Sequence, residues 1–464
     1  MTRAHRDRVQ LAIRPSRSAI GRQGGGLHLL VRAAPPAQPR RRERRPVALA
    51  LVIDRSGSMG QPAVDQSPGP SGLGTVAAML HRPQAGPASA GDTGRTDKLR
   101  FVKAATLRLI DLMQDGDAAA LVTFDDQVTV AKPLTVLDDR SRRALRDAVG
   151  RLQPGGSTYL EGGFRAGLGQ FGDEVRTRYG CKLVLLSDGE ANVGEQRPAV
   201  LSEVAAGAAR SGVTTSTLGV GLEYNIALMS ALAEAGNGDF THIGSLDTLD
   251  EILREEFTTA AEVTARGVEV DLELPERLAF GTNLNGYRQA DTDRGFTVHL
   301  GDLVRPKEFL FEISSPVPLE GDELVIAARA SYQDVNGAAG ECSARLALRV
   351  RDAEEAERQP VDEEVIRKLL VQLPARAEMD VALAYEAGDV TRARAILDAS
   401  RQSMADVRQR YGRAADARAE MGVWEARLAD LNVVAEGGPL SRAQVKTMFA
   451  ASYEQSRSRR RRSM

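Results

Sequence analysis

Residues 48–60 read ALALVIDRSGSMG, and this stretch decides how the chain is interpreted. The apolar run Ala48–Ile53 is typical of a buried strand, and it ends on Asp54. Two hydroxyl residues, Ser56 and Ser58, follow at alternate positions. A loop that leaves the carboxyl end of a strand can turn three alternate residues toward one point. The stretch therefore predicts part of a metal-binding loop.

The remaining ligands of such a site must come from other segments, because a hard cation such as Mg²⁺ takes about six oxygen ligands. Residues 154–163, PGGSTYLEGG, place Thr158 after a glycine pair and before a helical pattern. Residues 182–192, KLVLLSDGEAN, form a second apolar strand that ends on Asp188. We expect all three segments to meet at one edge of a single sheet.

The three segments resemble the metal-ion-dependent adhesion site of von Willebrand factor type A domains, in which Asp-x-Ser-x-Ser is followed by a Thr and then an Asp. The matching residues are Asp54, Ser56, Ser58, Thr158 and Asp188. The resemblance implies a doubly wound, Rossmann-like α/β fold with a mostly parallel sheet. It also implies bound Mg²⁺ or Mn²⁺, with one open coordination position for an Asp or Glu of a partner protein.

The composition is that of an ordinary globular protein. Of 464 residues, 42% are hydrophobic and 27% are charged, and the net charge of −2 provides no overall field for nucleic acid or acidic lipid. Two distant cysteines support neither a disulfide framework nor a zinc cluster. The basic N-terminus lacks an apolar segment, and no run approaches the ~18 apolar residues that span a bilayer. We therefore expect a cytoplasmic, bacterial protein with no membrane partner.

The hydrophobic period divides the chain into four parts. Residues 47–263 alternate strand and helix and form the expected type A domain. Residues 264–352 have apolar residues at every second position, which predicts a β-sandwich, and they resemble the strand module of bacterial calcium-activated chloride channel-like proteins. Residues 1–46 hold strands that complete this sandwich and a linker with the run Arg40–Arg45. Residues 353–464 predict a helical region with a basic tail.

The segment 61–95 departs from the family pattern, in which the first helix starts within a few residues of the metal loop. It is rich in Pro, Gly, Ser and Ala. Loops longer than roughly 12 to 15 residues are usually functional or disordered. We interpret the insertion either as a flexible flap that screens the partner or, equally, as a tolerated insertion.

Three functions are compatible with the sequence. The one that we favour is a metal-dependent protein-interaction module or scaffold that is not an enzyme. The alternative is a regulatory or assembly factor for a larger complex such as an AAA+ ATPase. A metal-dependent hydrolase is less favoured, because the histidines are scattered and only Glu161 and Glu190 lie near the metal segments in sequence. The terminal run Arg459–Arg462 is best interpreted as a solvated tail, which disfavours nucleic-acid binding.

Overall fold

A computed structural model gives the structure of the protein and describes residues 8–23, 25–36, 45–62, 97–244, 248–334, 337–412, 421–429, 431 and 440–457. The described residues fall into two compact units. The α/β unit comprises those between 45 and 266, and the sandwich unit comprises those up to 36 and from 267 onward. The predicted insertion lies outside the described residues except for Gln61 and Pro62, as do the terminal arginine run and all of the linker run except Arg45.

The α/β unit is built on one six-stranded sheet with the order β6-β5-β4-β7-β8-β9. Strand β6 (Val128–Val136) is antiparallel to β5 and forms one edge. The other strands are parallel to one another: β4 (Val47–Asp54), β5 (Ala118–Phe124), β7 (Gly180–Ser187), β8 (Val213–Val220) and β9 (Asn237–Ile243). Every residue of β4, β5 and β7 is buried, as expected for parallel strands covered on both faces. The predicted doubly wound fold is confirmed.

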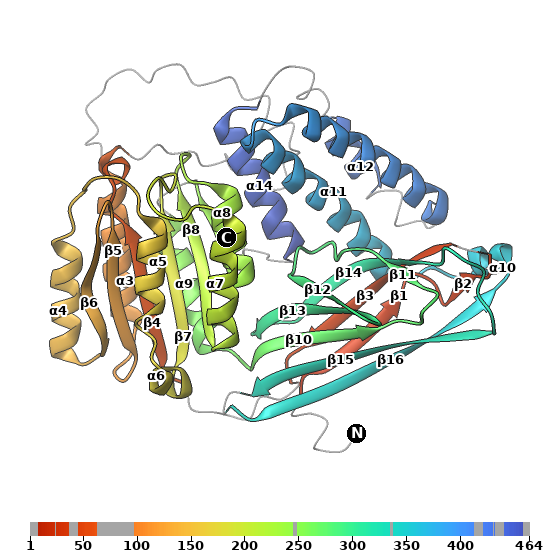
Figure 1. The fold of residues 1–464 in the computed structure, drawn as a ribbon, viewed down its shortest axis with the longest axis horizontal. Helices are drawn as coiled ribbons and strands as arrows, with labels where there is room; N and C mark the ends of the chain where they lie inside the picture. The colour runs from red at the N-terminus through yellow and green to blue at the C-terminus, as the bar shows by residue number, and fades with distance from the viewer. Residues whose placement is uncertain are drawn as a thin grey trace. The chain divides into compact units, whose positions relative to one another are not determined.

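Helices cover both faces of this sheet, as Figure 1 shows. They are η1 (Gly57–Gly60), α3 (Lys98–Leu112), α4 (Asp139–Gly150), α5 (Leu160–Leu168), α6 (Asp173–Arg178), α7 (Pro198–Arg210), α8 (Ile226–Ala235) and α9 (Leu249–Ala261). Helices α3, α4 and α9 share a core with alternate residues of β4, among them Leu49 and Leu51. Helix α5 lies on the opposite face, where a Cβ on Gly167 would meet Val52 at 2.4 Å. The side chain of Val52 points away from that first core, because neighbouring strand residues face opposite sides.

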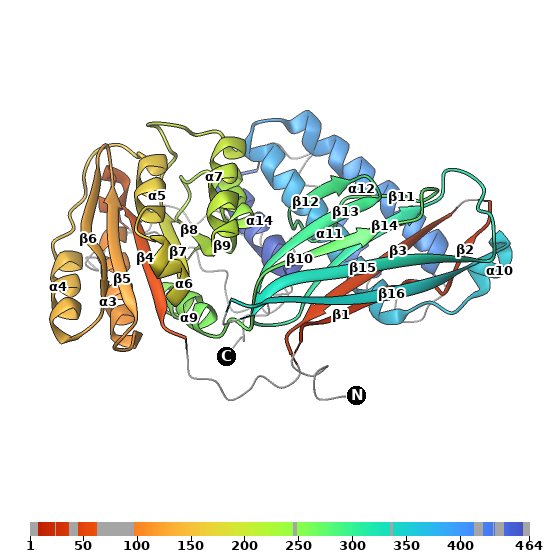
Figure 2. The ribbon, with the colours of Figure 1, turned by 60° about the horizontal axis from the view of Figure 1, so that its bottom comes forward.

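Two sheets form the sandwich unit, with the orders β1-β3-β14-β11 and β12-β13-β10-β15-β16-β2. Their strands are β1 (Gln10–Pro15), β2 (Ala19–Gly21), β3 (Gly26–Ala34), β10 (Ala265–Glu273), β11 (Ala279–Phe280), β12 (Gln289–Thr292), β13 (Gly295–Leu303), β14 (Lys307–Ser314), β15 (Glu323–Asp334) and β16 (Ala339–Arg351). Strand β3 pairs with β14, and β2 pairs with β16. Strands from the beginning of the chain are therefore paired with strands from its second half. Figure 2 shows β15 and β16 as one long antiparallel ribbon.

The two sheets face each other across an aromatic core. Phe296 of β13 and Phe311 of β14 belong to different sheets, and their ring centroids are 4.9 Å apart in an edge-to-face arrangement. Both rings are fully buried. Such pairs stabilise a core beyond the area that they bury. The strand pattern that predicted a sandwich therefore corresponds to two packed sheets.

The helices of the sandwich unit include α10 (Ala353–Arg358), α11 (Glu363–Glu386), α12 (Val390–Tyr411) and α14 (Arg442–Ser456), and residues 421–429 are also helical. Helix α11 packs against both α12 and α14, and Trp424 is buried in the core of this unit. A turn at Gly388-Asp389 separates α11 from α12, with Gly388 at a positive φ of 73° that favours glycine. Within the described ranges, no helix is both long and apolar enough to cross a membrane.

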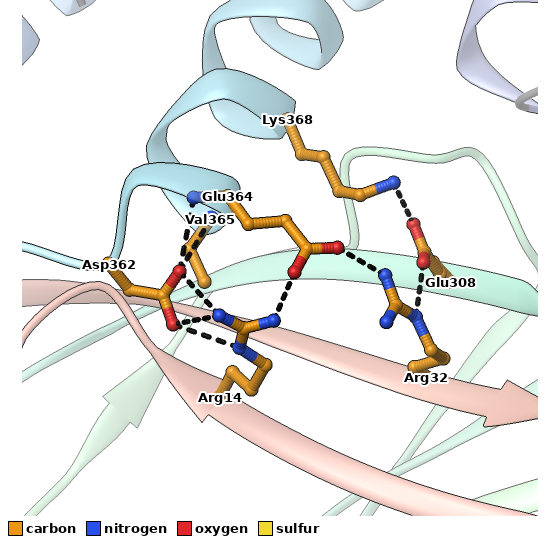
Figure 3. Close-up of polar contacts among 7 residues, drawn as sticks. All are labelled: Arg14, Arg32, Glu308, Asp362, Glu364, Val365 and Lys368. Atoms are coloured by element: carbon orange, nitrogen blue, oxygen red, sulfur yellow. Dashed lines mark hydrogen bonds and ion pairs between the residues drawn. The ribbon is translucent and has the colours of Figure 1, made fainter. Parts of the chain in front are cut away.

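Ion pairs fix α11 to the first sheet of the sandwich, as Figure 3 shows. Arg14 of β1 contacts Asp362, the N-cap of α11, with Nη2 and Oδ2 2.7 Å apart, and it also pairs with Glu364. Arg32 of β3 pairs with the same Glu364 and with Glu308 of β14. Strands near the N-terminus and a helix beyond residue 360 are therefore parts of one unit.

Candidate metal centre

Asp54 ends β4 and is fully buried. Its Oδ1 accepts a hydrogen bond from the backbone N–H of Ser56 at 2.8 Å, and its Oδ2 accepts one from the hydroxyl of Ser187 at 2.6 Å. The first bond turns the chain sharply after the strand, and the short helix η1 begins three residues after Asp54. The second bond connects the ends of β4 and β7, which are neighbours in the sheet.

Asp188 directly follows β7 and is also fully buried. Its Oδ1 accepts a hydrogen bond from the hydroxyl of Ser58 at 2.8 Å. The hydroxyl oxygens of Ser58 and Ser56 are 3.0 Å apart. The carboxylate of one strand end is therefore joined through two hydroxyls to the loop that leaves the other strand end.

The position of Gly189 shows that Thr158 belongs to the same cluster. A Cβ built on Gly189 would lie 3.1 Å from Thr158 Oγ1, 3.5 Å from Ser58 Oγ and 3.9 Å from Ser56 Oγ. Three hydroxyls thus surround one point beside Asp188. The structure brings together all five residues that the sequence predicts for the site.

Backbone bonds hold the Thr158 segment against the metal loop. The N–H of Gly57 donates to Gly156 O at 2.9 Å, and the N–H of Gly155 donates to Arg55 O at 2.6 Å. The carboxylate of Asp125 strengthens this junction, because it pairs with Arg55 at 2.9 Å and accepts from the N–H of Gly156 at 3.3 Å. The loop geometry is therefore built into the fold.

Burial makes it costly for this cluster to hold two negative charges. The pKa of Asp54 is raised to about 6, chiefly by desolvation and also by the nearby charge of Asp188, while hydrogen bonds from Ser187 and Ser56 oppose the shift. Two carboxylates close together and out of water favour a cation between or beside them.

The donors also fit a particular kind of ion. All five side chains offer oxygen, which suits Mg²⁺ or Mn²⁺ better than a soft metal. Among the described residues, no group of three or more His, Cys, Asp or Glu side chains is arranged to hold a metal. A site of the predicted type has only two carboxylates and completes its ligands with hydroxyls.

Sequence reasoning missed two residues of the cluster. Ser187 is the last residue of an apolar strand and was overlooked for that reason. Its position next to Asp188 in sequence could have identified it. Lys98 begins α3, and its Nζ lies 2.7 Å from Asp188 Oδ2. No spacing rule could connect Lys98 with the metal loop, because the segment 61–95 separates them in sequence.

Glu161 and Glu190 are the two acids considered for a hydrolase, and hydrogen bonds hold the first of them. Glu161 accepts hydrogen bonds from the N–H of Glu195 at 2.7 Å and from Arg165 Nε at 2.8 Å. Both contacts lower its pKa, and a lowered pKa makes a weaker base. Glu190 is exposed.

The described histidines make contacts elsewhere. His28 contacts Tyr411 in the sandwich unit, His242 contacts Tyr224, and His299 contacts Glu269. His81 lies outside the described residues.

Comparison with known proteins agrees with this geometry. Residues 49–190 match the family model described as von Willebrand factor type A domain. The chain is 26% identical over 179 residues to the uncharacterized protein YfbK of Escherichia coli (strain K12), covering 38% of this chain and 31% of that protein. It is 25% identical over 197 residues to human inter-alpha-trypsin inhibitor heavy chain H3, covering 41% of this chain and 22% of that protein. The matches thus span less than a third of the length of either relative.

Two solved structures share the fold over most of the chain. A von Willebrand factor type A protein from Catenulispora acidiphila superposes with a TM-score of 0.60 at 19% identity, covering 88% of this chain and 91% of that one. The ArnB paralog VWA2 from Sulfolobus acidocaldarius superposes with a TM-score of 0.55 at 16% identity, covering 95% and 98%. These similarities extend beyond the α/β unit.

Proposed function

Since the chain contains a von Willebrand factor type A domain, a type of domain that commonly mediates metal-dependent protein interaction, we propose that it is a metal-dependent protein-interaction module. The residues that hold the ion are Asp54, Ser56, Ser58, Thr158 and Asp188. The convergence of their five side chains at the carboxyl edge of one sheet carries the proposal. The ion is Mg²⁺ or Mn²⁺, and the partner presents an Asp or Glu.

Each of the five candidate ligands, and Ser187 beside them, has a defined role in this proposal. Asp54 and Asp188 supply the negative charge, and the hydroxyls of Ser56, Ser58 and Thr158 supply neutral oxygen donors. Ser187 holds Asp54 in place through its 2.6 Å hydrogen bond. When bound, the ion supplies a positive charge and an open position to which a carboxylate can bind.

We further propose that the chain is not an enzyme. The site lies at the carboxyl edge of a sheet, the pKa of Glu161 is lowered by its hydrogen bonds, and Glu190 is exposed. The histidines of the described residues make their contacts with other groups. These observations support a binding role for the site.

The test is affinity capture from a native lysate with tagged protein in Mg²⁺ and in EDTA. Three baits are compared: the wild type, Asp54→Ala and the control Asp173→Ala. Asp173 is in the same α/β unit and its side chain is 99% exposed, so its replacement changes the net charge equally without touching the site. We expect a protein that the wild type and the control capture in Mg²⁺ only. Equal capture by all three baits in both buffers would refute the proposal.

The same experiment addresses the alternative role in a larger complex. Mass spectrometry of the captured proteins identifies the partner directly. Recovery of an AAA+ ATPase in Mg²⁺, and its loss with Asp54→Ala, would make the chain an assembly or regulatory factor that works through this site.

A further inference from the structure

A buried ammonium group lies inside the candidate metal centre. The Lys98 side chain is only 9% exposed, and its Nζ is 2.7 Å from Oδ2 of Asp188. Because Ser58 donates to the other oxygen, Oδ1, both oxygens of this carboxylate are engaged. A candidate metal ligand is thus already paired with a positive charge that belongs to the chain itself.

The backbone around Lys98 is fixed beside the metal loop. The N–H of Lys98 donates to Gln61 O at 3.2 Å, and Pro62 and Asp97 form an antiparallel bridge. The carboxylate of Asp97 caps α3 by accepting from the N–H of Arg100 at 2.6 Å. Lys98 therefore occupies the first position of a capped helix whose start is attached to the end of the metal loop.

The end of β8 limits the space around the ammonium group. A Cβ on Gly221, which has a positive φ of 75°, would lie 3.4 Å from both Cε and Nζ of Lys98. The side chain therefore extends between the end of β8 and Asp188. Its position depends on tertiary structure on both sides and differs from that of a surface lysine.

The charges of the cluster give Lys98 a chemical role. Ionised Asp54 and Asp188 carry two negative charges, and Lys98 neutralises one of them. Arg55, the other basic residue of the loop, is already paired with Asp125. A divalent cation that binds beside Asp188 therefore meets the repulsion of a nearby ammonium group.

We infer that Lys98 is an internal counter-cation that weakens binding of the divalent ion at this site and leaves the loaded site with one excess positive charge. The inference rests on the proposed function and assigns a regulating residue to the same site. With Lys98 present, a loaded site needs one more negative charge for neutrality, and an Asp or Glu of a partner provides it. Without Lys98, the two aspartates alone would neutralise the ion.

The test is a titration of the full chain with Mn²⁺, in which electron paramagnetic resonance measures the concentration of free ion and so gives the affinity. Neutral replacements Lys98→Gln and Lys98→Met are expected to bind Mn²⁺ about tenfold more tightly than the wild type, the effect of one charge on a divalent ion across several ångströms. Lys98→Arg keeps the charge and should match the wild type. Arg100→Gln removes an exposed charge from the same helical turn and should also match it.

The outcomes separate this inference from the function on which it rests. Thermal unfolding in EDTA first confirms that each variant is folded, and the two neutral variants serve as replicates of each other. If the wild type binds Mn²⁺ and the neutral variants bind it equally or more weakly, the inference is wrong while the metal site stands. If neither the wild type nor any Lys98 variant binds Mn²⁺, the proposed metal site itself is wrong.

Discussion

Arg32 of β3 and Glu364 of α11 form an ion pair although they lie 332 positions apart in the chain. Arg32 also contacts Glu308 of β14, whose side chain is only 10% exposed. One guanidinium group thus connects two strands and a helix of the sandwich unit (Figure 3). The pair indicates that the sheet and the helix depend on each other.

Replacing Arg32 with Ala should lower the free energy of unfolding of the sandwich unit by about 1–3 kcal/mol, because two carboxylates lose a charged hydrogen-bond donor. Urea denaturation followed by circular dichroism measures the change. The control is Arg349→Ala, which removes an exposed arginine of β16 in the same unit. A loss no larger than that of the control would show that the network adds no stability.

Acid should destabilise the sandwich unit through His28. This residue is buried, and its Nδ1 lies 3.1 Å from the hydroxyl oxygen of Tyr411. Burial lowers its pKa to about 4, with Arg410 acting in the same direction and Glu312 opposing it. Unfolded histidine has a pKa near 6.5, so between pH 6.5 and about 4 the unfolded chain binds a proton that the folded chain does not. The contribution of His28 is therefore intact above pH 6.5, and up to about 3 kcal/mol is lost as the pH falls to 4.

Urea midpoints in EDTA at several pH values between 7.5 and 4.5 measure this effect. His28→Gln should be less stable than the wild type at neutral pH and should show a smaller loss on acidification. Thr292→Val, which replaces an exposed residue of β12 that carries no ionisable group, is the control and should retain the wild-type pH dependence. An unchanged slope for His28→Gln would contradict the assignment.

Removing the Thr158 hydroxyl should weaken the metal site without unfolding the domain. Thr158→Val keeps the shape of the side chain and removes one oxygen donor, so Mn²⁺ affinity should fall at least about tenfold. Thr129→Val makes the same change at an exposed position of β6 in the same unit and should leave the affinity unaltered. Wild-type affinity in Thr158→Val would remove Thr158 from the ligand set.

Helix α5 should tolerate no side chain at Gly163. A Cβ there would lie 2.4 Å from Cδ1 and 2.7 Å from Cγ of Phe124, which is fully buried and cannot move aside cheaply. Gly163→Ala should therefore destabilise the α/β unit by about 1–3 kcal/mol. The control is Gly150→Ala, because a Cβ at Gly150 meets nothing within 4 Å and alanine favours the helix. Equal thermal stability of the two variants would argue against this close packing.

Much of the α/β unit could be predicted because its strands are recognised from short, continuous stretches of sequence. Buried parallel strands are continuous apolar runs, and Asp54 and Asp188 stand where two such runs end. Helix starts are also set locally, and α4 begins at Asp139 because Asp138 and Ser141 form a reciprocal capping box. That the clustered residues bind a metal stays a prediction.

What the sequence did not predict depends on contacts between distant segments. Strand β2 has only three residues and exists through its pairing with β16. Lys98 reaches Asp188 only because the chain returns to the metal loop at Pro62 and Asp97. The pattern of hydrophobic residues cannot predict that Pro62 and Asp97 pair.

The bridge between Pro62 and Asp97 also has a practical use. These two residues are paired, so the 34 residues between them in sequence, 63–96, have both ends fixed at one place. Exchanging that stretch for a compact fluorescent protein with adjacent termini should preserve the hydrogen bonds at both junctions. The domain would then carry an optical reporter next to its ligand cluster, ready for use as a sensor.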